Sequence, residues 1–194
     1  TFGAHSQDYP TKPIRLVAPY SPGGSTDIVS RLVAPRLGAS LGKPVIVDNR
    51  PGASGTIGSN IVAKAAPDGY TLLFTTPGTH TAVLFTFKSL PYDPIADFTP
   101  ITAAVKQSGV ILVNNATGAR NWAEFIAYAK KNPGKMAYAT AGLGSSFHLA
   151  AETLKRSAGI DIFHVPYKGG APVAQAILSG EVPIALVSNT SGMS

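Results

Sequence analysis

The chain has 194 residues, which is enough to bury a proper core as one domain or as two small ones. Hydrophobic residues make up 44% of it and no apolar run is long enough to span a bilayer, which indicates a soluble globular protein. The net charge is +6, but the Lys and Arg residues are scattered without a nucleic-acid-binding signature, and the absence of cysteine excludes disulfides and thiolate chemistry.

Predicted strands and helices alternate along the first part of the chain. The apolar run at residues 14–18 predicts a strand, and a helix is expected from about Asp27 to Leu41. Pro35 lies inside that helix and is expected to kink or interrupt it, because proline lacks a backbone donor. The next expected elements are a strand at 44–49, a helix at 60–65 and a strand at 70–76.

A proline-rich segment at residues 88–102 breaks the alternation and predicts a crossing between two α/β lobes, placed between Tyr92 and Thr102. A second series of strand, glycine turn and helix follows. Its strands are expected at 109–115, at the beginning of residues 136–159, at the beginning of residues 162–180 and at 182–188, with helices at 121–134 and in the later parts of residues 136–159 and 162–180. Continuous apolar strands that alternate with helices indicate parallel sheets covered on both faces.

Three glycine-rich loops follow predicted strands, at residues 20–27, 140–146 and, more weakly, 75–79. Each combines glycine with Ser or Thr just before a helix, where unpaired N–H groups and hydroxyls can hold an anion. Gly23 and Gly24 are expected to let the backbone approach a ligand carboxylate, with positive φ permitted. The alternative is that these loops are only tight βα connections.

Catalytic and metal-binding interpretations fit the residues poorly. Ser146 and His148 lie two apart at a helix start and point to different faces, so no serine-hydrolase arrangement is expected. The glycines at 52, 55 and 58 are spaced wrongly for a dinucleotide fingerprint and indicate a structural turn. The four histidines show no metal-like spacing, so no metal, cofactor or catalytic residue is expected.

Two residues near the glycine loops keep two interpretations each. His148 either donates to a ligand oxygen or braces its loop, whereas His5, His80 and His164 are expected to be loop, cap or partly buried polar positions. Asp27 fits a helix cap or first-turn acid that orients its loop.

Three stretches resemble the Bug-type substrate-binding proteins of tripartite tricarboxylate transporters. The first is YPTKPIRLVAPYSPGGSTD and its continuation to residue 74, and the others are YATAGLGSSFHLAAETLK and VPYKGGAPVAQAILSGEV. Together they run from Tyr9 to about Val187. The resemblance implies a two-lobed periplasmic-binding-protein-like (type II) α/β fold, with a first lobe at residues 1–98 that lacks its C-terminal part and a second lobe at 99–194 with a return crossover near its end.

The resemblance also implies an exported, periplasmic receptor, with its signal peptide removed, that passes a small carboxylate to membrane permease subunits. The ligand is expected to be a di- or tricarboxylate, an amino acid or an aromatic acid. A monomer is expected, with a dimer as the alternative if the first lobe is incomplete. The alternative function is a ligand sensor of the same fold that signals to a membrane sensor kinase. The expected ligand-binding residues are Tyr20, Ser21, Pro22, Gly23, Gly24, Ser25, Asp27, Thr76, Gly78, Thr79, Gly142, Ser145, Ser146, His148 and Ser188.

Overall fold

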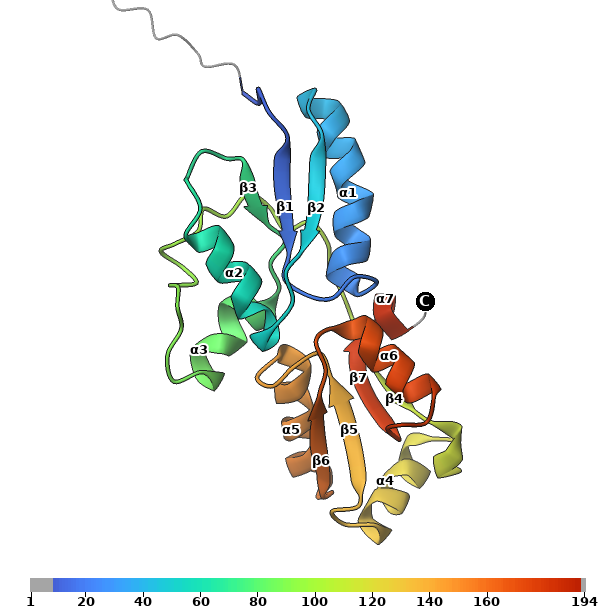
Figure 1. Cartoon of the computed structure of the whole chain (residues 1–194). Helices are drawn as coiled ribbons and strands as arrows, with labels where there is room; N and C mark the ends of the chain where they lie inside the picture. Colours follow the sequence, from blue (N-terminus) through green and yellow to red (C-terminus); the bar gives the residue numbers. More distant parts are fainter. Residues whose placement is uncertain (1–8, 193–194) are drawn as a thin grey trace, which may run out of the picture.

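The strands of the protein form two separate sheets that lie end to end, one in each lobe (Figure 1). A computed structural model describes residues 9–192, so His5 lies outside the described residues. The first three strands build one sheet and the last four build the other. The two-lobed α/β fold is therefore confirmed, while the division of the chain at residues 98 and 99 stays a prediction.

The first sheet has the strand order β2-β1-β3, and all of its pairs are parallel. Leu16 of the central strand faces Val47 on one side and Leu72 on the other. The central strand is buried because it has a neighbour on both sides and helices on its faces, as its run of apolar residues predicts. The strands are β1 (Ile14–Ala18), β2 (Val45–Asn49) and β3 (Thr71–Leu73).

The helix that follows β1 is α1 (Ser25–Leu41), and it runs through Pro35 without interruption. The expectation that this proline interrupts the helix was wrong, whereas the expected kink stays a prediction. Pro35 lies on the exposed side of the helix, where water can take the place of the missing proline N–H as a donor to the carbonyl of Arg31. The helix ends at Gly42, whose φ of 71° suits a glycine cap.

The second helix, α2 (Thr56–Ala63), begins at Thr56 and not near Asn60 as predicted. Gly58 lies inside this helix because nothing larger fits there. A Cβ atom on Gly58 would lie 2.9 Å from the carbonyl oxygen of Arg50 and from Cα of Pro19. Gly58, which was predicted to be part of a structural turn, therefore allows α2 to pack against the ends of β1 and β2.

The chain leaves the first lobe through a short helical stretch and a long irregular connection. The stretch contains a π-helical turn (Gly78–Ala82) and α3 (Val83–Thr86). The connection runs from Phe87 to Ser108 without helix or strand and includes the predicted crossing at 92–102.

The second sheet has the strand order β4-β7-β5-β6. Strands β5, β6 and β7 are parallel, but β4 is antiparallel to β7, so the expectation of purely parallel sheets was wrong. β4 arrives from the long connection and not through a βαβ crossover, and only the crossover forces neighbouring strands to be parallel. The strands are β4 (Gly109–Val113), β5 (Met136–Thr140), β6 (Ile162–Pro166) and β7 (Ile184–Ser188).

Helices cover both faces of the second sheet. On one face Phe125 and Ala151 pack against Tyr138 and Ile184, and on the other Val173 packs against Ala185. Asn121 starts the first of these helices by accepting a hydrogen bond from the Glu124 N–H with its side chain. The helices are α4 (Trp122–Lys131), α5 (Ser146–Ala158), α6 (Gly170–Leu178) and the short α7 (Asn189–Gly192).

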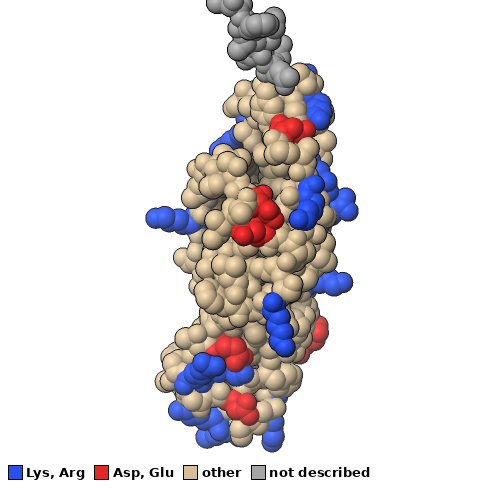
Figure 2. All heavy atoms as spheres, turned by 90° about the vertical axis from the view of Figure 1, so that its left-hand side faces the viewer, with Lys and Arg blue, Asp and Glu red and all other residues tan. Residues whose placement is uncertain are grey.

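Charged side chains are scattered over the visible face in Figure 2, with basic and acidic groups interspersed. Within residues 9–192 no helix is long and apolar enough to cross a membrane. In the same part of the chain no three His, Asp or Glu side chains come together in a way that could hold a metal ion.

Candidate functional site

The loops at the carboxyl ends of the parallel strands of both sheets point toward each other across the junction of the lobes (Figure 1). Ligands of open α/β sheets bind at these strand ends. Several hydrogen bonds cross the junction. Among them, the Ser21 hydroxyl donates to the Lys168 carbonyl (2.6 Å) and the Ser54 hydroxyl donates to the Leu143 carbonyl (2.5 Å). Each of these two bonds therefore joins a loop in which the sequence predicts an anion site to a loop of the other lobe in which it does not.

A cavity of about 280 Å³ lies at this junction and takes residues from both lobes. Of the expected ligand-binding residues, Tyr20 and Gly142 line it. The turn at 52–55 and the loop at 166–168 also line it, although neither was predicted to be part of the site. The lining residues are Tyr20, Gly52, Ala53, Ser54, Gly55, Phe87, Ala141, Gly142, Leu143, Pro166, Tyr167 and Lys168.

Four successive residues of the turn that follows β2 have positive φ. The values are 131° at Gly52, 45° at Ala53, 56° at Ser54 and 91° at Gly55. A positive φ is energetically unfavourable for Ala53 and Ser54, and a simple connection would not require it. Such backbone strain is concentrated at functional sites. The signal that could have found this turn was its place at the end of a predicted strand, the same argument that selected the other glycine loops.

Tyr20 joins the strained turn to the neighbouring threonine loop. Its hydroxyl donates to the carbonyl of Ser54 (3.1 Å) and lies 3.3 Å from the hydroxyl of Thr76. Burial raises the pKa of Tyr20, so the hydroxyl stays protonated and available as a donor. Gly78 approaches so closely that a Cβ atom there would lie 3.0 Å from the Tyr20 oxygen.

The amides of the first glycine loop are bonded within the protein. The Gly23 N–H donates to the Asp27 carboxylate (2.9 Å), the Gly24 N–H to the Ser21 carbonyl (3.3 Å) and the Ser25 N–H to the Ser191 hydroxyl (3.1 Å). Of the two glycines only Gly23 has a positive φ, at 76°, whereas Gly24 has φ −80° in the extended region. Pro22 and Gly23 are exposed.

Asp27 acts as an anion built into this loop. It is 4% exposed and pairs with Arg31 at 2.9 Å. Burial by itself would raise the pKa of Asp27, but hydrogen bonds from Arg31 and from the Gly23 N–H outweigh it and hold this pKa below its usual value. The carboxylate thus orients the loop, as the first-turn interpretation predicts.

Thr79 is fully buried and belongs to the internal bonding of its loop. Its hydroxyl lies 2.8 Å from that of Thr75 and donates to the carbonyl of Thr76 (3.0 Å), while its own carbonyl accepts from the Tyr92 hydroxyl (2.7 Å). Ser188 is likewise buried at the end of β7, where its hydroxyl donates to that of Ser191 (3.1 Å).

The loop before α5 brings its predicted residues together at the helix start. Ser145 caps α5, since its hydroxyl accepts from the His148 N–H (3.2 Å), and Ser146 is the first helical residue. His148 accepts a hydrogen bond from the Gly144 N–H at Nδ1 (3.1 Å). That bond corresponds to the loop-bracing interpretation of His148.

Lys168 is the one charged residue among those that line the cavity. Its carbonyl is held by the N–H (3.2 Å) and the hydroxyl of Ser21, so the residue sits directly at the junction of the lobes. The other lining residues are neutral and include the hydroxyl groups of Tyr20, Ser54 and Tyr167. The Tyr167 hydroxyl is already engaged, because it donates to Glu181 (2.7 Å). A cavity with one cation and no carboxylate on its walls is suited to an anion.

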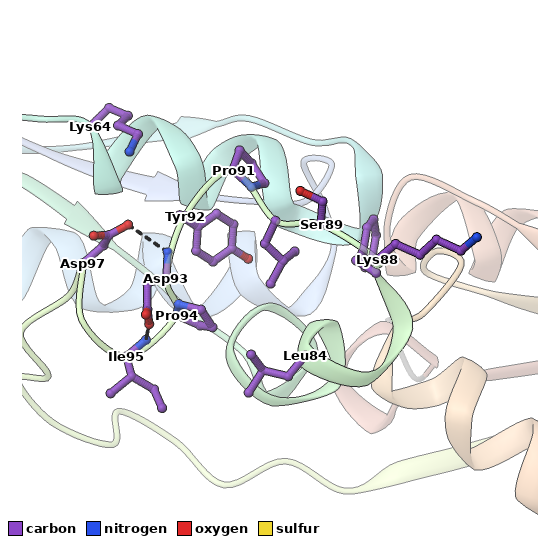
Figure 3. Close-up of a pocket in the computed structure, with 12 residues that line it drawn as sticks. Lys64, Leu84, Lys88, Ser89, Pro91, Tyr92, Asp93, Pro94, Ile95 and Asp97 are labelled. Atoms are coloured by element: carbon purple, nitrogen blue, oxygen red, sulfur yellow. Dashed lines mark hydrogen bonds between the residues drawn. The ribbon is translucent and has the colours of Figure 1, made fainter.

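A larger hollow of about 640 Å³ lies on the outer side of the first lobe (Figure 3). It is an open surface feature with Lys64 and Lys88 against Asp93 and Asp97, so its charges balance. Both carboxylates are used locally: Asp93 accepts from the N–H of Ile95 (2.8 Å) and Asp97 from the N–H of Asp93 (2.8 Å). The cavity between the lobes is the better candidate site.

Comparison with protein families gives one match that covers most of the chain. The family described as "Tripartite tricarboxylate transporter family receptor" matches residues 29–193. Protein BugT of Bordetella pertussis is 39% identical over 175 residues, which are 90% of this chain and 54% of that protein. A protein encoded in the tcbD-tcbE intergenic region of Pseudomonas sp. strain P51 is 37% identical over 94% of this chain and 54% of its own length.

Several solved structures have a fold similar to that of this chain. A periplasmic transporter has a TM-score of 0.92 at 42% identity, over 95% of this chain and 62% of that one. An R. palustris protein with adipate has a TM-score of 0.89 at 36% identity, over 93% and 60%. MatC from Rhodopseudomonas palustris with bound malate has a TM-score of 0.87 at 33% identity, over 93% and 61%. The chain spans about half the length of the curated relatives it matches.

Proposed function

The chain belongs to the family of tripartite tricarboxylate transporter receptors, and on that premise we propose that it binds a small carboxylate in the cavity between its lobes. The receptor then delivers the ligand, outside the cytoplasm, to membrane subunits of the transporter. The site residues of this proposal are those that line the cavity, together with the expected residues that hold them in place.

The observation that carries the proposal is the charge on the cavity walls. Lys168 is positive, no lining residue is acidic, and the remaining polar groups are neutral hydroxyls and backbone. A hydrogen bond between such a cation and a carboxylate contributes about 1.5–3 kcal/mol, more than a bond between neutral groups. Adipate and malate, which are bound by two proteins of the same fold, are both small dicarboxylates and are the first ligands to try.

The size of the cavity favours a small ligand. A volume of about 280 Å³ lies just below the range for small-molecule sites, which runs from roughly 300 to 1,000 Å³. Tyr20, Phe87 and Tyr167 add aromatic surface against which a short carbon chain can pack. We therefore place the carboxylates at the polar loops and the carbon chain against these rings.

Titration calorimetry of the protein tests the proposal, with malate, adipate and citrate as ligands and the matched diamides of malate and adipate as controls. We expect at least one acid to bind with a Kd near the micromolar range, about −8 kcal/mol, and its diamide to bind at least tenfold more weakly. Equal affinity for acid and diamide, or no binding of any of the acids, would contradict the proposal.

A further inference from the structure

The ring of His148 folds back onto the glycine loop that precedes its own helix. It lies in the first turn of α5, and its Nδ1 atom accepts the hydrogen bond from the Gly144 N–H at 3.1 Å. A backbone N–H can only donate, so Nδ1 must carry a free lone pair and the imidazole must be neutral with its proton on Nε2. A doubly protonated imidazole has no acceptor left and cannot make this bond.

The loop that His148 holds forms part of the cavity wall and of the contact between the lobes. Gly142 and Leu143 line the cavity, and the Leu143 carbonyl accepts from Ser54 of the first lobe. Gly144 has φ 78° and packs so tightly that a Cβ atom there would lie 2.6 Å from the Thr86 hydroxyl of the first lobe. The position of the Gly144 amide is therefore coupled to the shape of the site.

The surroundings of the ring oppose a positive charge on it. His148 stacks on His164 of β6, with centroids 4.2 Å apart and planes at 26°, and Tyr138 of β5 stacks next in line. Burial lowers the pKa of His148, Glu152 of α5 raises it and Lys155 of the same helix lowers it, with a net decrease. Glu152 offsets only part of the decrease in this pKa, and its carboxylate is also bonded to Lys155 (2.8 Å) and to the Tyr138 hydroxyl (2.5 Å).

His164 cannot replace His148 in this role. Its Nε2 lies 2.7 Å from the hydroxyl of Thr140, away from the Gly144 amide. Burial and the neighbouring His148 lower the pKa of His164 to about 4, so it stays neutral across the range in which an ordinary histidine titrates.

We propose that His148 is a positioning residue that, as a neutral imidazole, holds the loop at residues 142–145 in its ligand-binding form and releases the loop when it is protonated. The part of this proposal that concerns affinity rests on the proposed carboxylate binding, whereas the part that concerns the loop does not. Because the neutral form is the competent one, affinity is complete above the pKa of His148 and falls as the pH decreases through it. That pKa lies below the ordinary histidine value of about 6.5, so the loss begins in mildly acidic solution.

The test compares the wild type with His148→Asn, whose side-chain oxygen can accept from Gly144 but does not titrate. His164→Gln is the matched control, since its amide can keep the bond to Thr140 and removes the neighbouring titratable ring. Affinity for malate and for adipate is measured by calorimetry from about pH 8 to about pH 5. The ionisation of the ligand is common to all variants, so it cancels in the ratio of their affinities.

We expect the ratio of the wild-type affinity to the His148→Asn affinity to fall several-fold between the upper and the lower pH, whatever its value at the upper pH. The His164→Gln variant should follow the wild type. A ratio that stays constant with pH, or a pH dependence that disappears in His164→Gln, would overturn the proposal.

A second readout does not depend on any ligand. In NMR spectra of the ligand-free protein, the amide cross-peak of Gly144 should titrate with the pKa of His148 in the wild type and stay fixed in His148→Asn. If neither malate nor adipate binds, the proposed function fails, but this titration still decides whether His148 holds the loop. A Gly144 cross-peak that ignores the His148 titration would refute that role.

Discussion

Single residues in the glycine loops perform different tasks despite their similar sequence context. Asp27 supplies the negative charge to its own loop by accepting from the Gly23 N–H, so that loop already holds an anion that belongs to the protein. Lys168 lies in the loop at 166–168, which was not predicted to be part of the site, yet it brings the one charge to the cavity. A side chain's place at the junction of the lobes depends on both lobes at once, so the pattern of one loop could not predict it.

At the residue scale, we expect Lys168→Gln to weaken carboxylate binding about tenfold, or 1.4 kcal/mol, because it removes the positive charge and keeps most of the side chain. Calorimetry with malate and adipate measures the effect. Raising the salt concentration to about 0.5 M should narrow the difference, since the charge lies at an open junction and is screened.

Two matched variants make the Lys168 result specific. Lys168→Arg keeps the charge and should retain most of the affinity. Lys135→Gln removes an exposed lysine outside the cavity lining, so it should leave the affinity within about twofold. If Lys135→Gln weakens binding as much as Lys168→Gln, the effect comes from net charge and not from the cavity.

At the scale of elements, the sequence predicts most of the strands because each one is a short apolar run that ends in a turn. β1 agrees with the predicted run residue for residue, since Pro19 ends it abruptly. The predicted start of α2 was wrong because Gly58 belongs to this helix. The absence of a side chain at Gly58 allows α2 to pack closely against Pro19. A contact between segments distant in sequence decides that helix start, and local pattern does not contain it.

Pro35 lies in the interior of α1 and is expected to reduce the stability of this helix. The proline removes one hydrogen bond from the interior of α1, and its ring crowds the preceding turn. We expect Pro35→Ala to raise the free energy of unfolding by about 1–3 kcal/mol, less than the full helix preference because the unfolded chain also gains freedom. Urea denaturation followed by circular dichroism measures it, with the exposed neighbour variant Arg36→Ala expected to change stability by less than about 0.5 kcal/mol. A decrease in stability for Pro35→Ala would show that the proline ring packs usefully where it lies.

For the whole molecule, the two lobes could be predicted because the proline-rich segment separates two series of strands and helices. The antiparallel β4 could not, because its direction depends on where the long connection delivers the chain and not on its own residues. The partners of the junction could not be predicted either. Ser21 with Lys168 and Ser54 with Leu143 are contacts between loops of opposite lobes, and each loop's sequence is compatible with many such partners.

Gly142 lines the cavity and also packs against the first lobe. It has φ 145°, a region open in practice only to glycine, and a Cβ atom there would lie 2.5 Å from the Ser54 hydroxyl of the opposite lobe. Gly142→Ala should therefore act twice. It should lower the free energy of unfolding by about 1–3 kcal/mol through backbone strain, and it should hold the lobes apart so that affinity for malate or adipate falls at least tenfold, about 1.4 kcal/mol.

Gly118→Ala separates these two effects. Gly118 also has a positive φ, 73°, but a Cβ atom there would meet nothing within 4 Å. This variant should lose about 1–2 kcal/mol of stability through strain alone and bind the carboxylate like the wild type. Urea denaturation and calorimetry on both variants decide the matter. Gly142→Ala could instead bind the carboxylate like the wild type while it loses the same stability as Gly118→Ala. In that case the contact between Gly142 and Ser54 is not needed for binding, and the cavity between the lobes is not the binding site.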